Sequence, residues 1–271
     1  DGAELFERLR TSYPTLGTIT DIFVGIQTSA DHIYIMRLTE RRQNTTVLYS
    51  KSLGRDWEFE NEVVLPVVSG TDVWRYQTLP ERQYILFPYE VHDEQATLIP
   101  LKTLAQRYPL AAAYLAANRK ELEDRERGKF RDSQWYRFGR NQNIGIQGRM
   151  KLCVPRLVEY LYVTIDTKGD HVLDNVDVCG ITLKAAYAST NPYYLMGVLN
   201  SAILRWFFPK VSAPFRGGWW SANRQFLSQL PIRLIDPTNP TDRAQHDHLV
   251  ALVQQMLDLH QRHAAEGNPQ M

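Results

Sequence analysis

The stretch from residue 193 to residue 235 constrains the fold most, because it joins a strongly apolar segment to a loop that cannot continue a helix. Apolar residues recur at spacings of mostly three to five over residues 193–208, which predicts a helix buried over much of its circumference. Asn191 and Pro192 suit the N-cap and the first turn, and Pro209 ends the helix. We therefore expect a core helix followed by an exposed loop that forms the functional surface.

That loop, PFRGGWWSANR at residues 214–224, places two indoles, two guanidiniums and an amide within eleven residues. This mixture suits stacking on bases and bidentate hydrogen bonds to base edges and phosphates. The residues predicted to contact a ligand are Arg216, Trp219, Trp220, Asn223 and Arg224. For each tryptophan the alternative is that it closes the core beneath the loop. The segment QLPIRLI, at residues 229–235, then reads as a strand.

Charge is uneven along the chain. The net charge is +1, from 31 basic and 30 acidic residues, so the chain lacks the basic excess of a nonspecific nucleic-acid binder. Yet residues 178–235 contain no Asp or Glu and six basic residues, and residues 125–156 contain nine basic residues against two acids. A polyanion is the expected partner if the two stretches converge in space. The alternative is a set of solvated helix faces and loops.

Two further polar segments are candidates for the same surface. RFGRNQN, at residues 137–143, is dense in bidentate donors and would otherwise be a solvated loop. Its predicted contact residues are Arg137, Arg140, Asn141 and Gln142. Weaker additions are Arg75, beside a turn, and a polar loop that follows Gly25 and joins two strand-like runs in a hairpin-like arrangement. The residues of that loop are Gln27, Thr28 and Ser29.

The pattern of the whole chain predicts an α+β fold with mixed, largely antiparallel strands. At 271 residues and 44% hydrophobic, the chain can bury one large core or two small ones. Residues 1–12 read as an amphipathic helix, and residues 101–127 read as helical, with Pro109 opening a second helix. Strand-like runs occur at residues 62–70, 84–88, 151–158, 161–166 and 170–179. We expect one recognition unit over residues 1–235, in two lobes that join near residues 100–130.

Residues 236–271 are predicted to form a linker and an amphipathic helix. Leu249, Leu252, Met256 and Leu259 follow a three, four, three spacing, which is an a/d seam about two heptads long. This helix packs on its own domain or, through residues 245–263, on a partner helix.

No pattern in the sequence indicates catalysis. A P-loop, a GxSxG elbow, a glycine-rich adenosylmethionine loop and a PD...ExK layout are absent, and the histidines show no metal-ligand spacing. Cys153 and Cys179 lack CxxC spacing and read as buried thiols of a reducing, cytoplasmic compartment. No apolar run is long enough to span a membrane. We therefore predict no catalytic residue, metal or cofactor in this chain, which starts at Asp1 and is expected to be part of a longer protein.

Several segments, in this order, carry a family resemblance: GIQTSADHIYIM, LPVVSGTDVWRYQTLPERQYILFPY, YPLAAAYLAANRKELEDRERGKF, WYRFGRNQNI, KLCVPRL and VLNSAILRWFF with the basic loop and LPI. Over roughly residues 16–235 the chain resembles the TaqI-like C-terminal specificity domain. That domain belongs to N6-adenine DNA methyltransferases and to fused type IIG restriction-modification enzymes. The C-terminal LVALVQQMLDLHQR is similar to the helix that follows recognition domains in type I specificity subunits.

The resemblance implies a target-recognition domain that lies against duplex DNA opposite a methyltransferase domain of the same longer chain. Basic side chains would neutralise phosphates, while a few Arg, Asn and Gln side chains would read base edges. Trp219 and Trp220 would stack on bases or act as wedges. Flipping of the adenine, and S-adenosylmethionine, are expected in the catalytic domain outside this chain. Base-reading residues vary with the target site in this family, so none is carried over.

Asn191-Pro192-Tyr193-Tyr194 is similar to the NPPY motif that holds a flipped adenine in amino-methyltransferases. The second proline is missing and the segment opens a helix, so we interpret it as a helix cap. Two other functions stay open. A protein-interaction module would associate through the C-terminal helix without salt-sensitive DNA binding, and a cryptic nuclease would show metal-dependent turnover.

Overall fold

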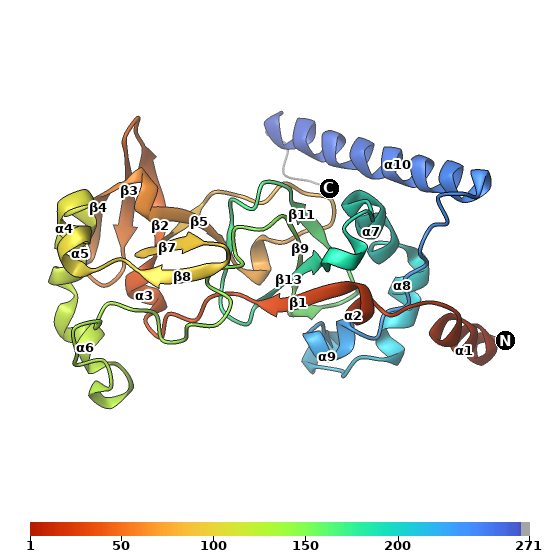
Figure 1. Ribbon diagram of the computed structural model, residues 1–271, viewed down its shortest axis with the longest axis horizontal. Coiled ribbons are helices and arrows are strands. Elements are labelled where there is room, and N and C mark those ends of the chain that lie inside the picture. The colour runs from red at the N-terminus through yellow and green to blue at the C-terminus, as the bar shows by residue number, and fades with distance from the viewer. Residues whose placement is uncertain (267–271) are drawn as a thin grey trace.

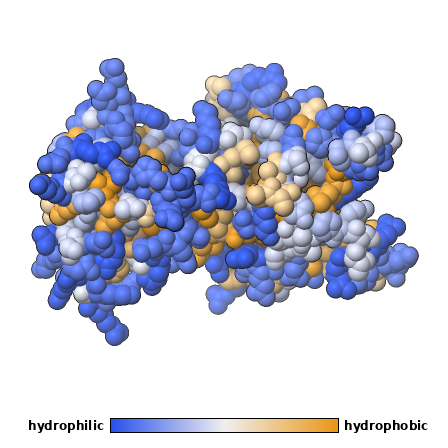
Figure 2. Space-filling view, viewed as in Figure 1, coloured by the Kyte–Doolittle hydropathy of each residue, from blue (hydrophilic) through white to orange (hydrophobic). Residues whose placement is uncertain are grey.

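The computed structural model describes residues 1–266, which form two lobes side by side along the longest axis of the molecule (Figure 1). Apolar side chains reach the visible surface more over the second lobe than over the first, which is mostly hydrophilic (Figure 2). Within residues 1–266, no helix has both the length and the apolar character needed to cross a membrane.

The first lobe contains a six-stranded sheet with the order β12-β5-β6-β2-β3-β4 and a separate β7–β8 hairpin. Its strands are β2 (Ile35–Arg41), β3 (Thr45–Ser50), β4 (Arg55–Glu60), β5 (Val64–Val68), β6 (Gln83–Leu86), β7 (Tyr89–His92), β8 (Gln95–Leu98) and β12 (Val172–Leu173). Its helices are α3 (Asp31–Tyr34), α4 (Leu101–Arg107), α5 (Pro109–Ala117) and α6 (Arg119–Gly128). One apolar core lies between this sheet and the helices.

The second lobe contains a four-stranded sheet with the order β1-β13-β9-β11 and the short pair β10–β14. Its strands are β1 (Thr20–Val24), β9 (Lys151–Pro155), β10 (Leu157–Val158), β11 (Thr164–Asp166), β13 (Val178–Leu183) and β14 (Trp220–Ser221). Its helices are α1 (Gly2–Ser12), α2 (Leu16–Ile19), α7 (Pro192–Leu199), α8 (Ala202–Phe207), α9 (Arg224–Leu227) and α10 (Pro240–Ala265). The β12–β5 pair is parallel and the other strand pairs are antiparallel, which confirms the predicted α+β class.

A third apolar cluster joins the lobes. Phe23 and Cys153, from the second-lobe sheet, pack with Val68 and Leu173 from the first-lobe sheet. Strand β12 hydrogen-bonds with β5, and the chain then enters the second lobe as β13. Residues 100–130, where we predicted the lobes to join, instead lie within the helical layer of the first lobe.

Residues 69–80 form an arm that extends from the first lobe onto the second. The indole of Trp74 stacks on the ring of Tyr162, with 6.0 Å between centroids and 5° between planes. The Gln77 carbonyl oxygen accepts a hydrogen bond from the Thr164 hydroxyl at 2.5 Å. The arm therefore fixes the two lobes relative to each other.

The structure corrects two predictions about local elements. The predicted hairpin around Gln27 is wrong, because β1 and β2 belong to different sheets. The segment QLPIRLI is not a strand: Pro231 forms only an isolated bridge with Thr15, although Leu230 and Ile232 are fully buried. Apolar alternation here reflects burial without strand pairing.

The predicted core helix over residues 193–208 is two helices, α7 and α8. Asn200 separates them, and its side-chain amide forms two hydrogen bonds with the backbone of Val163, at 2.9 and 3.0 Å. Asn191 caps α7 by accepting a hydrogen bond from the amide of Tyr193 at 2.8 Å, which confirms the interpretation as a cap. Pro109 begins α5 as predicted.

The C-terminal helix α10 packs on its own domain, against α7. Leu249, Val253 and Leu257 face the second-lobe core, and Gly197 allows close approach, because a Cβ there would lie 2.9 Å from Leu249 and Val253. Leu252, Met256 and Leu259 are exposed on the adjacent face of the helix.

Candidate nucleic-acid interface

The buried guanidinium of Arg125 fixes two polar loops of the first lobe. Its side chain donates hydrogen bonds to the carbonyl oxygens of Thr28, Trp135 and Arg137, at 2.7, 2.7 and 2.9 Å. The guanidinium also lies 4.0 Å from the centroid of the Phe130 ring. Five N–H donors in one plane allow this contact with separate segments, so Arg125 acts as a junction between them.

The two loops held by this junction are residues 27–29 and 137–142, together called the first-lobe loop pair. The Gly139 amide donates a hydrogen bond to the Thr28 carbonyl at 3.0 Å. A Cβ at Gly139 would lie 1.9 Å from the hydroxyl oxygen of Ser29, so the close approach requires glycine. Two polar segments that are far apart in the sequence are thus brought to one place.

The cations of this loop pair already have carboxylate partners. Arg137 donates to Asp132 at 2.7 Å and Arg140 donates to Glu126 at 2.7 Å. The hydrogen bond from Arg140 holds the pKa of Glu126 below its usual range. A phosphate would have to compete with these carboxylates, so the two arginines contribute less attraction to a polyanion than unpaired ones.

The remaining side chains of the first-lobe loop pair differ in whether they are free to contact a ligand. Asn141 and Gln142 are exposed, and their side chains form no hydrogen bond within residues 1–266. Ser29 donates to a carboxylate oxygen of Glu126 at 3.2 Å, and Gln27 is half-buried. The Thr28 side chain is fully buried and its hydroxyl donates to a neighbouring carboxylate at 2.5 Å, so it holds the loop.

In the second lobe, the basic loop exposes unpaired cations. Arg216 and Arg224 are exposed, and neither forms an ion pair with any residue between 1 and 266. Trp219 is 37% exposed and Phe215, which the sequence analysis passed over, is 55% exposed. Its position next to Arg216, a predicted contact residue, is the sequence signal that could have identified Phe215.

The other predicted residues of this region have structural contacts. Trp220 lies in β14 and packs partly against the second-lobe core. Asn223 caps α9 by accepting a hydrogen bond from Gln225 N–H at 3.0 Å. Arg75 donates to the Asn200 carbonyl at 2.7 Å and its guanidinium lies over a tyrosine ring, so it contributes to the arm between the lobes.

The elements beside the two basic regions lie along one edge of the molecule. Figure 1 shows α6, which leads into the first-lobe loop pair, and α9, which follows the basic loop, along the same edge of the molecule, the lower one in that view. Helix α10 lies along the opposite edge. A rod-like polyanion along the lower edge would therefore reach both regions.

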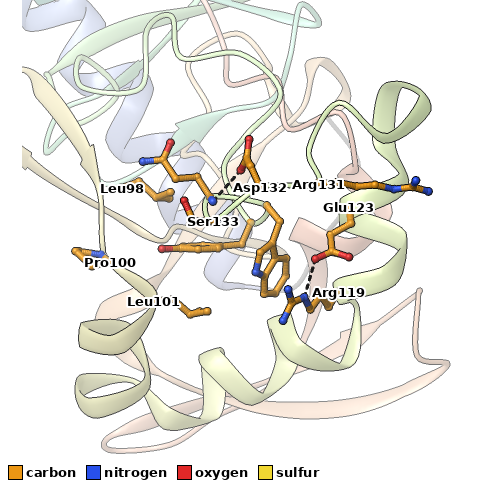
Figure 3. A pocket seen from close by; sticks show the side chains of 11 residues that line it. Leu98, Pro100, Leu101, Arg119, Glu123, Arg131, Asp132 and Ser133 are labelled. Carbon is orange, nitrogen blue, oxygen red and sulfur yellow. Dashed lines mark hydrogen bonds and ion pairs between the residues drawn. The ribbon is translucent and has the colours of Figure 1, made fainter.

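A cavity of about 680 Å³ opens beside α6, and Figure 3 shows the side chains that line it. Arg119 and Glu123 pair across it at 2.7 Å, and Asp132 accepts a hydrogen bond from the Gln134 amide at 2.8 Å. The charged groups here satisfy one another and brace the turn before Arg137. We find no arrangement of a nucleophile and a base in this cavity.

Asp174 is a largely buried carboxyl group whose charge is affected by neighbouring acidic residues. Burial, followed by the charge of Asp31, raises the pKa of Asp174 to about 7. No cluster of three or more His, Cys, Asp or Glu side chains within residues 1–266 is arranged to hold a metal ion. Cys153 and Cys179 are buried free thiols, and burial raises their pKa to about 12 and about 11, which leaves them unreactive.

Comparison with known proteins gives one family and two relatives. The family described as the TaqI-like C-terminal specificity domain matches residues 65–232. The type II restriction enzyme and methyltransferase RM.Eco57I of Escherichia coli is 26% identical over 237 residues, which cover 82% of this chain and 23% of that protein. The type II methyltransferase M.PaeR7I of Pseudomonas aeruginosa is 26% identical over 256 residues, 90% of this chain and 38% of that protein. The chain thus spans less than half the length of either relative.

Proposed function

The chain belongs to the family of TaqI-like C-terminal specificity domains, and we propose that it recognises a short duplex DNA site for an adenine-N6 methyltransferase of a restriction-modification system. The observation that carries this proposal is the pair of exposed arginines without ion pairs, Arg216 and Arg224, on the same edge as the first-lobe loop pair. Both relatives are named as methyltransferases, which supports the link to DNA methylation.

In this proposal, duplex DNA lies along the lower edge of Figure 1 and contacts both lobes. Arg216 and Arg224 neutralise phosphates without first breaking an ion pair. Asn141 and Gln142 have free amides, whose donor and acceptor match the N6 and N7 atoms of adenine in the major groove. Arg137 and Arg140 reach DNA by exchanging their carboxylate partners for phosphates.

The chain supplies recognition, and a methyltransferase domain supplies the reaction. We assign methyl transfer, the binding of S-adenosylmethionine and the pocket for a flipped adenine to that domain, outside this chain. No catalytic residue is proposed here. The function of this chain is to position the site, so that the adenine faces the catalytic domain.

The test begins with binding of the chain to a randomised duplex pool at several salt concentrations, followed by sequencing of the retained DNA. A recovered short motif, with affinity that falls as salt rises, is the expected result. Absence of retention at low salt would contradict the proposal for this chain.

We predict that Arg216→Ala and Arg224→Ala each weaken binding to the recovered site about tenfold and reduce the salt slope by about one. The matched control is Arg243→Ala, which removes an exposed arginine from α10, on the opposite edge. Fluorescence anisotropy of a labelled duplex measures both quantities. Equal affinities for the wild-type chain and both variants would exclude these arginines from the interface.

A second function rests on one observation, the exposed stripe of Leu252, Met256 and Leu259 on α10. These residues keep the four, three spacing of a helix seam, while the neighbouring face of α10, with Leu249 and Val253, packs on α7. This stripe is suited to contact with a partner helix. Such a contact leaves the lower edge free for DNA.

A further inference from the structure

The basic loop of the second lobe has a rigid base. Residues 213–221 form a narrow arch, in which the Phe215 amide donates to the Trp219 carbonyl at 2.6 Å and the Ser221 amide donates to the Ala213 carbonyl at 3.1 Å. Strand β14 pairs with β10 through Val158 and Trp220. This anchoring means that the tip does not collapse onto the lobe. We call residues 215–219 the finger.

The finger can turn tightly only because of its two glycines. Gly217 and Gly218 have φ values of +73° and +83°, in the left-handed region that disfavours other residues. A Cβ at Gly218 would meet no atom within 4 Å, so the tip projects into open space. The turn begins at Phe215 and ends at Trp219, and Arg216 precedes its two glycines.

Exposure of these rings is costly unless a partner covers them. Phe215 is 55% exposed and Trp219 is 37% exposed, although each ring could bury a large apolar area. Lone exposed apolar residues are common, but two exposed aromatic rings on one anchored turn form a preformed binding element. The finger is therefore expected to fill an apolar space in another molecule.

Charge around the finger favours DNA as that molecule. No acidic residue occurs between residues 178 and 235, and Arg216 and Arg224 have no ion-pair partner within residues 1–266. The finger thus combines one unpaired cation, Arg216, with two flat apolar rings. Duplex DNA offers the complementary pair, anionic phosphates around apolar base faces.

We infer that the finger is a wedge, which enters the minor groove of the bound duplex and inserts Phe215 or Trp219 at one base step. Arg216 then lies in the groove between the two phosphate chains, where the negative potential is strong. Insertion partly unstacks the step and bends the duplex, as apolar wedges do in other minor-groove binders. This inference rests on the proposed DNA recognition and adds a local opening of the helix.

The experiment uses the recovered duplex site in two forms. One form carries 2-aminopurine at each position in turn, whose fluorescence rises when its neighbours unstack. The other form carries a single abasic position at each step, where the cost of unstacking is already removed. We expect the wild-type chain to raise the fluorescence several-fold at one step only, and to bind the duplex with an abasic position there about tenfold more tightly than the intact duplex.

The double variant Phe215→Ala/Trp219→Ala is expected to lose the fluorescence rise and the preference for the abasic duplex, while it still binds the intact duplex. The single variant that loses both signals identifies the inserted ring. Phe215→Trp should keep both signals. The control is Ile203→Ala, which removes a side chain of the same lobe that is 45% exposed. Melting temperatures check that each variant is folded.

The outcomes separate the wedge from the proposed function. Tight, salt-dependent binding without a fluorescence rise at any step overturns the wedge and leaves DNA recognition intact. Failure of the wild-type chain to bind any duplex overturns both. Unchanged DNA signals in the Phe215→Ala/Trp219→Ala double variant, together with altered sedimentation of the chain, would assign the finger to protein contact and overturn the wedge.

Discussion

A single buried guanidinium determines where the two polar loops of the first lobe lie. Arg125 is only 7% exposed and donates to three carbonyl oxygens in two separate segments, at Thr28 and at residues 135–137. In the sequence, Arg125 is only the first of nine basic residues between positions 125 and 156. Nothing in its local sequence distinguishes it from Arg127, two residues later, which is exposed.

At the residue scale, we predict that Arg125→Met lowers the free energy of unfolding by about 3 kcal/mol, because three carbonyl groups lose a donor while buried. Binding of the recovered duplex should also weaken, since the first-lobe loop pair loses its junction. Urea unfolding and fluorescence anisotropy measure the two effects. Arg127→Met is the matched control, and an equal loss of stability in both variants would contradict the role of Arg125.

Helix α10 illustrates a property of whole elements. The sequence predicted a seam of Leu249, Leu252, Met256 and Leu259, and left open whether it faces the same domain or a partner. The structure divides the seam: Leu249 turns inward with Val253, while Leu252, Met256 and Leu259 face outward. Because α10 has apolar residues on two adjacent faces, one face can pack on α7 while the other stays exposed for contact with a partner.

At the element scale, Val253→Lys should lower the melting temperature by at least about 5 °C, because Val253 is 1% exposed and a charge cannot be solvated there. Leu252→Lys, one residue earlier, should change it by less than about 2 °C. Differential scanning calorimetry compares the two. If the exposed stripe binds a partner helix, Leu252→Lys weakens association in sedimentation experiments without loss of stability. An equal loss of stability in both variants would mean that α10 packs differently.

The whole molecule has two lobes but a continuous interior. The cluster that contains Phe23, Val68, Cys153 and Leu173 takes side chains from both sheets, and the arm at residues 69–80 crosses onto the second lobe. Duplex DNA that contacts both basic regions therefore meets surfaces held in a fixed relation. Such rigidity favours recognition, because no ordering of the lobes is required on binding.

At the scale of the molecule, we predict one cooperative unfolding transition for both lobes. Leu173→Ala, in the shared cluster, should destabilise both lobes together by about 2 to 4 kcal/mol. Hydrogen exchange during urea unfolding reports β3 in the first lobe and β9 in the second. Two separate midpoints in the wild-type chain, or protection lost from one lobe only in the variant, would show that the lobes are independent.

The sequence by itself determined the α+β class, the helix cap at Asn191, the helix start at Pro109, the thiols without a partner and the family. The fold class, the cap and the helix start follow from composition and from spacings over a few residues. The family follows from the order of motifs along the chain. The sequence also predicted an uneven charge that could gather on one surface. It could not say which cations of that surface are free.

Tertiary structure decided the rest, because burial and pairing depend on segments that are distant in the chain. It separated β1 from β2 into different sheets and left QLPIRLI buried without a strand. It also paired Arg137 and Arg140 with carboxylates while Arg216 and Arg224 stayed unpaired within residues 1–266. Arginines at different positions therefore attract a polyanion to different degrees. Whether a carboxylate lies within ion-pair distance of an arginine depends on the folded chain and cannot be read from the sequence.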